Sequence, residues 1–291
     1  MESLICNNIC KKYKDKTVLD NVNLTIEHGK IYGLIGRNGA GKTTLLSIMS
    51  AQNPATDGSV TIGDKQVWEN AAALADICFA RELNSGSCLA TMQLKKYLKT
   101  ASLFYRDWDN DMAEKLVKIF ELDEKKVISE LSKGMMSMVT IIVALASKAA
   151  YTFLDEPVAG LDVVAREQFY KLLIDEYSNT GRTFIISTHI IDEASDVFEE
   201  VIFLNDKKIM LKENTQELLN RAVYVSGRDD AVDAAVTGMK TYGTETLGRQ
   251  KAVTVLLNEG QHIEANADID VHPVTLQHLF TALCGSEIKT L

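Results

Sequence analysis

The sequence predicts an α/β protein whose mostly parallel core sheet is covered by helices on both faces. Apolar runs of strand length at residues 31–35, 151–154 and 183–188 are each followed by a polar loop or a helical pattern. Residues 91–147 instead carry helical periodicity, which predicts a helical subdomain inserted into this alternation. Residues 221–291 mix strand-like and helix-like runs, and we expect a small α+β appendage there. Parallel strands joined by helices place ligands at the carboxyl ends of the strands.

The composition is that of an ordinary globular protein with room for one large domain and a smaller one. The 291 residues are 46% hydrophobic and 24% charged, with a formal net charge of -9. Because nonspecific nucleic-acid binding usually needs a basic face, this balance argues against a nucleic-acid partner, although a local basic patch stays open. We interpret the scattered cysteines as buried free thiols in a reducing cytosol. They are Cys6, Cys10, Cys78, Cys88 and Cys284.

We expect neither a secretory signal nor a membrane span. No charged n-region followed by an apolar h-region occurs at the start of the chain. The longest uncharged apolar run, between Lys133 and Lys148, falls short of the roughly 20 residues that a bilayer requires. This run therefore predicts a helix buried in protein. If the protein acts at a membrane, we expect it to do so from outside the lipid.

Apolar periodicity predicts the elements of the first half of the chain. Residues 4–6 and 22–26 are expected strands, the second with the period of two that is typical of a half-buried strand. A turn at His28-Gly29 leads into the buried strand, and a helix begins at Lys42. In the inserted block, Asp109 is a predicted N-cap. Apolar residues recur there at helical spacing: Leu94, Leu98, Ala101, Phe104, Tyr105, Met112, Leu116, Ile119 and Phe120.

The second half of the chain resumes the alternation. A helix with Phe169, Leu172, Leu173 and Tyr177 on one face precedes the strand at 183–188. Residues 201–204 and 209–211 predict a hairpin that turns at Asn205-Asp206, and Asn214 with Glu217 predicts a capped short helix. In the appendage we expect strands at 223–225 and 253–257 and helices at 231–239 and 276–283.

Residues 36–44 match the phosphate-binding pattern G-x-x-x-x-G-K-[ST], between the strand and the helix that it requires. Its glycines permit backbone angles at which consecutive N–H groups turn toward an anion, and the helix start adds further donors. Lys42 is expected to reach the β- and γ-phosphates, and the Thr43 hydroxyl to ligate Mg²⁺. The alternative, a chance glycine-rich turn, does not explain this context. The predicted nucleotide-binding residues are Gly36, Asn38, Gly39, Ala40, Gly41, Lys42, Thr43 and Thr44.

The strand at 151–154 ends in two carboxylates, Asp155 and Glu156. Taken alone they are weak evidence, because many buried strands end in acids. Downstream of a phosphate loop, Asp155 is expected to hold Mg²⁺, directly or through water. Glu156 is expected to orient and polarise the attacking water. The sequence therefore predicts Mg²⁺-dependent hydrolysis of ATP.

Further motifs carry a family resemblance. Residues 131–135, Leu-Ser-Lys-Gly-Met, resemble the signature motif of ABC ATPases, LSGGQ in its common form. Residues 157–162 resemble the D-loop of that family, and residues 187–189 resemble its switch-histidine segment. Together with Tyr13 and the phosphate loop, these motifs cover most of residues 1–210 in the family's order.

The resemblance implies a P-loop NTPase fold of the ABC ATPase type with an N-terminal antiparallel β subdomain. We expect the ABC ATPase domain over 1–220, with its helical subdomain at about 88–148, and a small C-terminal α+β domain of unknown role over 221–291. ABC ATPases of this kind form a head-to-tail dimer around two ATP molecules. The partner can be a second copy of the chain or a different ABC ATPase subunit.

Roles of single residues follow from the resemblance. Ser132 and Gly134 of one subunit contact the γ-phosphate held by Lys42 of the other, and Gly134 is expected to open a helix whose N-terminal donors meet the anion. His189 senses the γ-phosphate by hydrogen bonding, although a lone histidine is more often structural. The ring of Tyr13 stacks on adenine, with plain surface packing as the alternative. The resemblance also places Asp162 of the D-loop at the nucleotide.

Two motifs, the Q-loop and the signature, depart from the family's pattern. Glu82 stands where the Mg²⁺-facing glutamine of the Q-loop is usual, so a carboxylate ligates the metal but adds negative charge near the γ-phosphate. Met135 replaces the signature glutamine and cannot donate a hydrogen bond to the partner's ribose. Lys133 adds a cation that either strengthens the γ-phosphate contact or faces solvent. Both departures could slow turnover, but neither removes a group that hydrolysis needs.

A cassette without membrane spans looks like the ATPase subunit of a transporter whose polytopic permease is a separate chain. We expect it on the cytoplasmic, inner face of the cell membrane, with residues 83–94 receiving a segment of the permease. The signature form and the appendage look most like bacterial exporters of drugs and antimicrobial peptides. The alternatives are a soluble ABC ATPase of DNA repair or translation and an ATP-gated regulator. A DNA-repair ATPase would need a long coiled coil between the phosphate loop and residue 131, and this chain has no room for one. The presence of Glu156 argues against a regulator that binds ATP with little hydrolysis.

Overall fold

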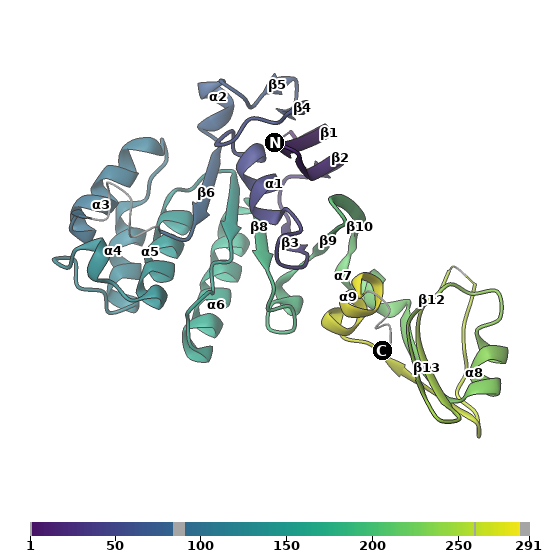
Figure 1. Ribbon diagram of the computed structural model, residues 1–291. Helices are drawn as coiled ribbons and strands as arrows, with labels where there is room; N and C mark the ends of the chain where they lie inside the picture. Colours follow the sequence, from purple (N-terminus) through teal and green to yellow (C-terminus); the bar gives the residue numbers. More distant parts are fainter. Residues whose placement is uncertain (1, 84–90, 259, 286–291) are drawn as a thin grey trace. The chain divides into compact units, whose positions relative to one another are not determined.

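The computed structural model describes residues 2–83, 91–258 and 260–285, and the chain divides into two compact units (Figure 1). The first unit comprises Met1–His189 and Glu200–Lys212, and the second comprises Ile190–Glu199 and Glu213–Leu291. This grouping differs from the expected division after residue 220 in two segments, 190–199 and 213–220, which pack with the second unit.

A six-stranded, mostly parallel sheet forms the centre of the first unit, as predicted. The strand order is β10-β9-β3-β8-β7-β6, and β3 pairs in parallel with both β8 and β9. The central strands are apolar and buried because helices cover them. The bounds are β3 (Ile31–Ile35), β6 (Ile77–Arg81), β7 (Tyr151–Asp155), β8 (Thr183–Thr188), β9 (Glu200–Asn205) and β10 (Lys208–Asn214).

The helices of the core follow the strands that carry the predicted motifs. Helix α1 (Lys42–Met49) follows β3, and α6 (Val163–Thr180) connects β7 to β8. Phe169 and Leu173 of α6 are fully buried, which confirms the predicted inward face. The carboxyl ends of β3, β7 and β8 therefore lie side by side and lead into the phosphate loop, the Asp155-Glu156 pair and His189.

The antiparallel β subdomain is also confirmed, as a four-stranded sheet in the order β2-β1-β4-β5. Its buried side chains, among them Leu4, Leu19 and Ile26, share one hydrophobic cluster with Leu45 of α1 and Phe153 of β7. This shared core fixes the sheet against the phosphate-loop helix. The bounds are β1 (Leu4–Tyr13), β2 (Lys16–Ile26), β4 (Asp57–Ile62) and β5 (Lys65–Gln66), with the short helix α2 (Ala71–Leu74) after them.

The inserted block is helical, and it lies beside β6 in Figure 1. Asp109 caps α4 by accepting a hydrogen bond from the Met112 amide at 2.8 Å, as predicted. Neither Phe104 nor Tyr105 belongs to α3, which ends at Ala101: Phe104 lies in a 3-10 turn and is 76% exposed, whereas Tyr105 is half-buried. The bounds are α3 (Leu94–Ala101), η2 (Ser102–Phe104), α4 (Asn110–Ile119), η3 (Ile128–Glu130) and α5 (Lys133–Ala146).

Helix α5 contains the long apolar run and is buried in protein along most of its length. None of the helices within the described ranges is both long and apolar enough to cross a bilayer. The thiols of Cys6, Cys78 and Cys284 are buried, whereas Cys10 is only half-buried, and Cys88 lies outside the described residues. Burial raises the pKa of Cys6 to about 12.

The second unit contains a four-stranded antiparallel sheet in the order β12-β13-β11-β14, as the predicted α+β class requires. Val225, Val253 and Ile269 form its core with Val232 of α8. The bounds are η4 (Ser195–Val197), α7 (Thr215–Asn220), β11 (Ala222–Arg228), α8 (Asp229–Ala235), β12 (Thr241–Leu247), β13 (Gln250–Leu256), β14 (Ile269–Pro273) and α9 (Leu276–Cys284).

Two local expectations need correction, and a third is confirmed. The turn between β9 and β10 is at Asp206-Lys207, whose φ angles are 45° and 70°, and not at Asn205-Asp206. The predicted helix at 231–239 ends at Ala235. The cap at Asn214 is confirmed, because its side chain accepts a hydrogen bond from the Glu217 amide at 3.0 Å.

A buried ionic cluster anchors the C-terminal end of α5 to the core. The Arg182 guanidinium donates to the carbonyl oxygens of Ala144 and Leu145 at 3.2 and 2.9 Å. It also lies 3.2 Å from a carboxylate oxygen of Glu176, which is in turn 2.9 Å from Lys148. Burial lowers the pKa of Arg182, and Glu176 opposes that shift. The last carbonyls of α5, which lack helical partners, are satisfied in this way.

Replacing Arg182 with Met is expected to lower the free energy of unfolding by about 3 kcal/mol, because it leaves buried carbonyls and a buried carboxylate short of a partner. Urea denaturation measures the change. Lys171→Met, at an exposed position of α6, is the matched control and should stay within about 0.5 kcal/mol of the parent. Equal effects of the two substitutions would show that the cluster does not anchor α5.

Candidate functional site

The glycine-rich loop between β3 and α1 leads into a helix that has no side-chain cap. Gly41 precedes α1 with φ 110°, and no side chain caps this helix. A Cβ at Gly36 would lie 2.6 Å from the Leu204 carbonyl oxygen, so the loop packs closely on β9. Gly39 also has a positive φ of 81°. The first N–H groups of α1 therefore face outward with their positive dipole end, as an anion site requires.

Lys42 places a buried ammonium group in this loop. The side chain is only 7% exposed, and its Nζ donates to the carbonyl oxygen of Gly36 at 2.7 Å. Burial lowers the pKa of Lys42, while the nearby carboxylates of Glu156 and Asp155 oppose this shift. Carbonyl oxygens neutralise no charge, and the Glu156 carboxylate is 3.8 Å away. A polyanion in the loop would complete the coordination of this cation, so the residues fit a phosphate ligand.

The two carboxylates after β7 occupy different environments. Asp155 is buried and accepts a hydrogen bond from the Ser187 hydroxyl on β8. Glu156 is half-buried and adopts a φ of 52°, while its amide donates to the Ser187 hydroxyl oxygen at 3.1 Å. His189 Nδ1 lies 2.6 Å from a carboxylate oxygen of Glu156. Lys42, Glu156 and His189, predicted from three separate segments, are thus brought together.

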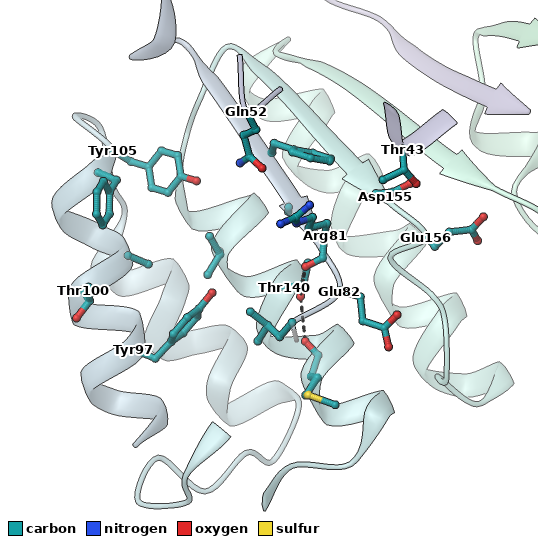
Figure 2. Close-up of a pocket in the computed structure, with 17 residues that line it drawn as sticks. Thr43, Gln52, Arg81, Glu82, Tyr97, Thr100, Tyr105, Thr140, Asp155 and Glu156 are labelled. Carbon is teal, nitrogen blue, oxygen red and sulfur yellow. Dashed lines mark hydrogen bonds between the residues drawn. The ribbon is translucent and has the colours of Figure 1, made fainter. Parts of the chain in front are cut away.

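Asp155 and Glu156 line a cavity of about 960 Å³ (Figure 2). Figure 2 shows Thr43, Asp155 and Glu156 along one side of it and Tyr97, Thr100 and Tyr105 along the other. Arg81 and Glu82, at the end of β6, lie between the two sides. Glu82 therefore shares a cavity with the predicted metal-ligating residues, as the sequence predicts.

The cavity offers only part of a metal site. The Thr43 hydroxyl and the carboxylates of Asp155 and Glu82 are hard oxygen donors, which suit Mg²⁺. In the part of the chain that the structure describes, no group of three or more histidine, cysteine or acidic side chains could hold a metal ion. Mg²⁺ is commonly held by one or two carboxylates together with substrate phosphates, so these residues fit the ion only in company with a nucleotide.

The signature-like segment forms the N-terminus of α5. Ser132 is the N-cap, accepting a hydrogen bond from the Met135 amide at 3.2 Å, and its side chain is exposed. The helix begins at Lys133, so the expectation that Gly134 opens it is wrong by one residue. A Cβ at Gly134 would lie 2.6 Å from the Gly160 carbonyl oxygen. Glycine at 134 thus permits close contact between α5 and the D-loop-like segment.

The D-loop-like segment is held by two further hydrogen bonds. The Ser137 hydroxyl donates to the Ala159 carbonyl oxygen at 2.6 Å. Asp162 caps α6, accepting from the Ala165 amide at 2.8 Å, which gives this carboxylate a structural task within its own chain. Its assignment to the nucleotide stays a prediction.

Tyr13 lies at the end of β1 and is 47% exposed. Its hydroxyl accepts a hydrogen bond from the Asn53 side chain, and the Lys11 ammonium lies 4.9 Å from the centre of its ring. The side chain is not among those lining the cavity. Stacking on adenine therefore stays a prediction for this ring.

Sequence reasoning missed residues that shape the site. Ser187 bridges Asp155 and Glu156, Leu204 sets the close approach to Gly36, and Gln52 lines the cavity. Val18 of β2 packs against Gly41, where a Cβ would lie 3.2 Å from its carbonyl oxygen. Ser187 carried a signal, a hydroxyl at the end of a buried strand two residues before His189. The others depend on contacts between distant segments and carried none.

Comparisons with known proteins find ATP-binding proteins of transport systems. The profile of the family described as ABC transporter matches residues 19–159. A manganese transport system ATP-binding protein of Listeria monocytogenes is 32% identical over 68% of this chain and 84% of its own length. A lantibiotic transport ATP-binding protein of Streptococcus pyogenes is 28% identical over 76% of this chain and 97% of its own.

A solved ATP-binding cassette, a dimer in a post-hydrolysis state bound to ADP and Pi, is similar in fold with a TM-score of 0.64. It is 24% identical and covers 73% of this chain and 98% of its own. This likeness confirms the predicted fold class.

Replacing Ser187 with Ala is expected to destabilise the protein by about 1–3 kcal/mol, because it leaves the buried Asp155 carboxylate without its hydroxyl donor. Urea denaturation of the two proteins measures the difference. Ser59→Ala on the half-buried strand β4 is the control and should change stability by less than about 0.5 kcal/mol. If Ser187→Ala behaves like the control, the hydroxyl does not support the carboxylate.

Proposed function

The chain belongs to the family of ABC transporter ATP-binding proteins, and from this premise we propose how its residues bind and hydrolyse ATP to power transport. One observation carries the assignment of residues: Glu156 lies between the Lys42 ammonium at 3.8 Å and the His189 ring at 2.6 Å. This arrangement brings a phosphate-binding cation, a carboxylate base and a polar sensor to one end of the sheet.

We propose that the loop N–H groups and Lys42 bind the β- and γ-phosphates of ATP. Glu156 accepts a hydrogen bond from the attacking water and aligns it with the γ-phosphorus. A neutral imidazole has one N–H, so His189 donates to the Glu156 carboxylate in this structure and would donate to a γ-phosphate oxygen instead when ATP is bound. Thr43, Asp155 and Glu82 are the residues that would hold Mg²⁺, which neutralises charge on the phosphates when bound. Phosphoryl transfer needs positioning and charge stabilisation, and these groups supply both.

We propose that the working unit is a head-to-tail dimer. The exposed Ser132 side chain and the N-terminal donors of α5 meet the γ-phosphate bound by the partner subunit. Val163 and Val164, which follow Asp162, are 60% and 74% exposed, and apolar exposure beside the D-loop is what a covered interface would explain. The partner is a second copy or a different ABC ATPase subunit.

We propose a polytopic membrane permease as the other partner, with the chain on the inner face of the membrane. The cavity that joins the nucleotide-facing residues to the helical subdomain would transmit closure to the permease. The expected contact at residues 83–94 lies mostly outside the described residues. Export of a drug or antimicrobial peptide is the favoured direction, supported by the lantibiotic transport relative, whereas the manganese transport relative keeps another substrate class open.

Replacing Glu156 with Gln is expected to lower the kcat for ATP hydrolysis by about 10²–10⁴-fold, because the amide cannot accept the proton of the attacking water. Binding of ATP should persist, and the variant should form a dimer when ATP is added, as seen by light scattering after size-exclusion chromatography. Glu167→Gln, an exposed position of α6, is the matched control and should keep the parental rate. Hydrolysis by Glu156→Gln at the parental rate would contradict the assignment.

A further inference from the structure

The two charged residues that depart from the family's pattern meet in space. The Lys133 ammonium lies 3.6 Å from the Glu82 carboxylate, and the two side chains are 57% and 52% exposed. Glu82 follows β6 and lines the cavity, whereas Lys133 is the first residue of α5, directly after Ser132. The ion pair thus joins the metal-facing segment to the signature-like segment of the same chain.

The stem of Lys133 makes a second contact. A Cβ at Gly160 would lie 2.9 Å from Cγ of Lys133 and 3.3 Å from its Cβ, so the aliphatic stem packs on the D-loop-like segment. Gly160 keeps a positive φ of 79°, which leaves room for that stem. Packing of the stem therefore directs the Lys133 side chain so that its ammonium group lies beside the Glu82 carboxylate.

The charges in the cavity explain why this pairing matters. Glu82, Asp155 and Glu156 place three carboxylates in one cavity, where Arg81 is the one cation among the described lining residues, and a triphosphate would add further negative charge. Lys42 offsets Glu156, from which it is 3.8 Å away. The glutamine that is usual in the family at position 82 carries no charge, whereas Glu82 adds a negative one. The positive charge of Lys133 offsets it.

We propose that Lys133 is a positioning residue for Glu82, which neutralises this carboxylate and holds it at the rim of the cavity so that it tolerates the triphosphate. The inference rests on the proposed function. Lys133 acts within its own subunit through Glu82. A direct contact with the partner's nucleotide is the competing role, and the experiment separates the two.

The test measures the Kd of Mg²⁺-loaded AMP-PNP, an ATP analogue that is not hydrolysed, by isothermal titration calorimetry. Lys133→Ala is expected to weaken binding about two- to five-fold, the range that an exposed ion pair can supply, because Glu82 is left unpaired. In the Glu82→Gln background, Lys133→Ala should change Kd by less than about two-fold relative to Glu82→Gln alone, because no Glu82 charge remains for Lys133 to offset. Lys125→Ala, an exposed lysine of the same subdomain, is the control and should leave Kd unchanged.

Two results would overturn the inference. Unchanged binding by Lys133→Ala would show that the pair does not affect the site. Equal weakening by Lys133→Ala in the parent and in the Glu82→Gln background would show that Lys133 acts elsewhere, as a contact to the partner's phosphate would. Thermal melting of each variant without nucleotide checks that the substitution leaves the fold intact. Absence of binding by the parent protein would refute the proposed function instead, so the two failures are distinguishable.

Discussion

The buried ammonium group of Lys42 is the constraint on which the rest of the site depends. It lies inside the loop against the Gly36 carbonyl, and burial alone would favour its loss of charge. The surrounding chain is suited to binding an anion beside this ammonium group. Glycines shape the loop, α1 begins without a side-chain cap, and the Glu156 carboxylate lies 3.8 Å from Lys42. A nucleotide triphosphate would add phosphate oxygens to the Gly36 carbonyl and the Glu156 carboxylate that already lie near this cation.

The parallel sheet brings the other residues of the site close to Lys42. Because β3, β7 and β8 are neighbours in parallel register, their carboxyl ends bring the loop, Glu156 and His189 within reach of one another. The second half of the proposed composite site lies on a different segment, the N-terminus of α5. Ser132 is exposed at the start of α5, and the Lys133–Glu82 pair and the Gly134–Gly160 contact connect that start to the cavity and to the D-loop-like segment. Closure across two subunits would therefore act on all three segments together.

The elements that the sequence predicts well are those whose burial shows in their composition. The strands at 31–35 and 183–188 are continuous apolar runs, and the structure buries every residue of both. Strands β12 and β14 were missed because they are polar and largely exposed, so no apolar period marks them. The turn after β9 was misplaced by one residue, since both Asn205 and Asp206 suit a turn and only the pairing of the strands decides between them. In the site, motif residues were predictable from local sequence, whereas Leu204, Gln52 and the Glu82–Lys133 pair required the tertiary fold.

The most direct measurement of the central claim is the equilibrium affinity for ATP of a Lys42→Ala variant that also carries Glu156→Gln, so that no turnover occurs. If the buried ammonium exists to hold the triphosphate, Kd should rise roughly 30-fold or more relative to Glu156→Gln alone, the cost of removing one partner of a buried charge pair. An unchanged Kd, in a protein whose melting temperature matches that of Glu156→Gln, would contradict the account.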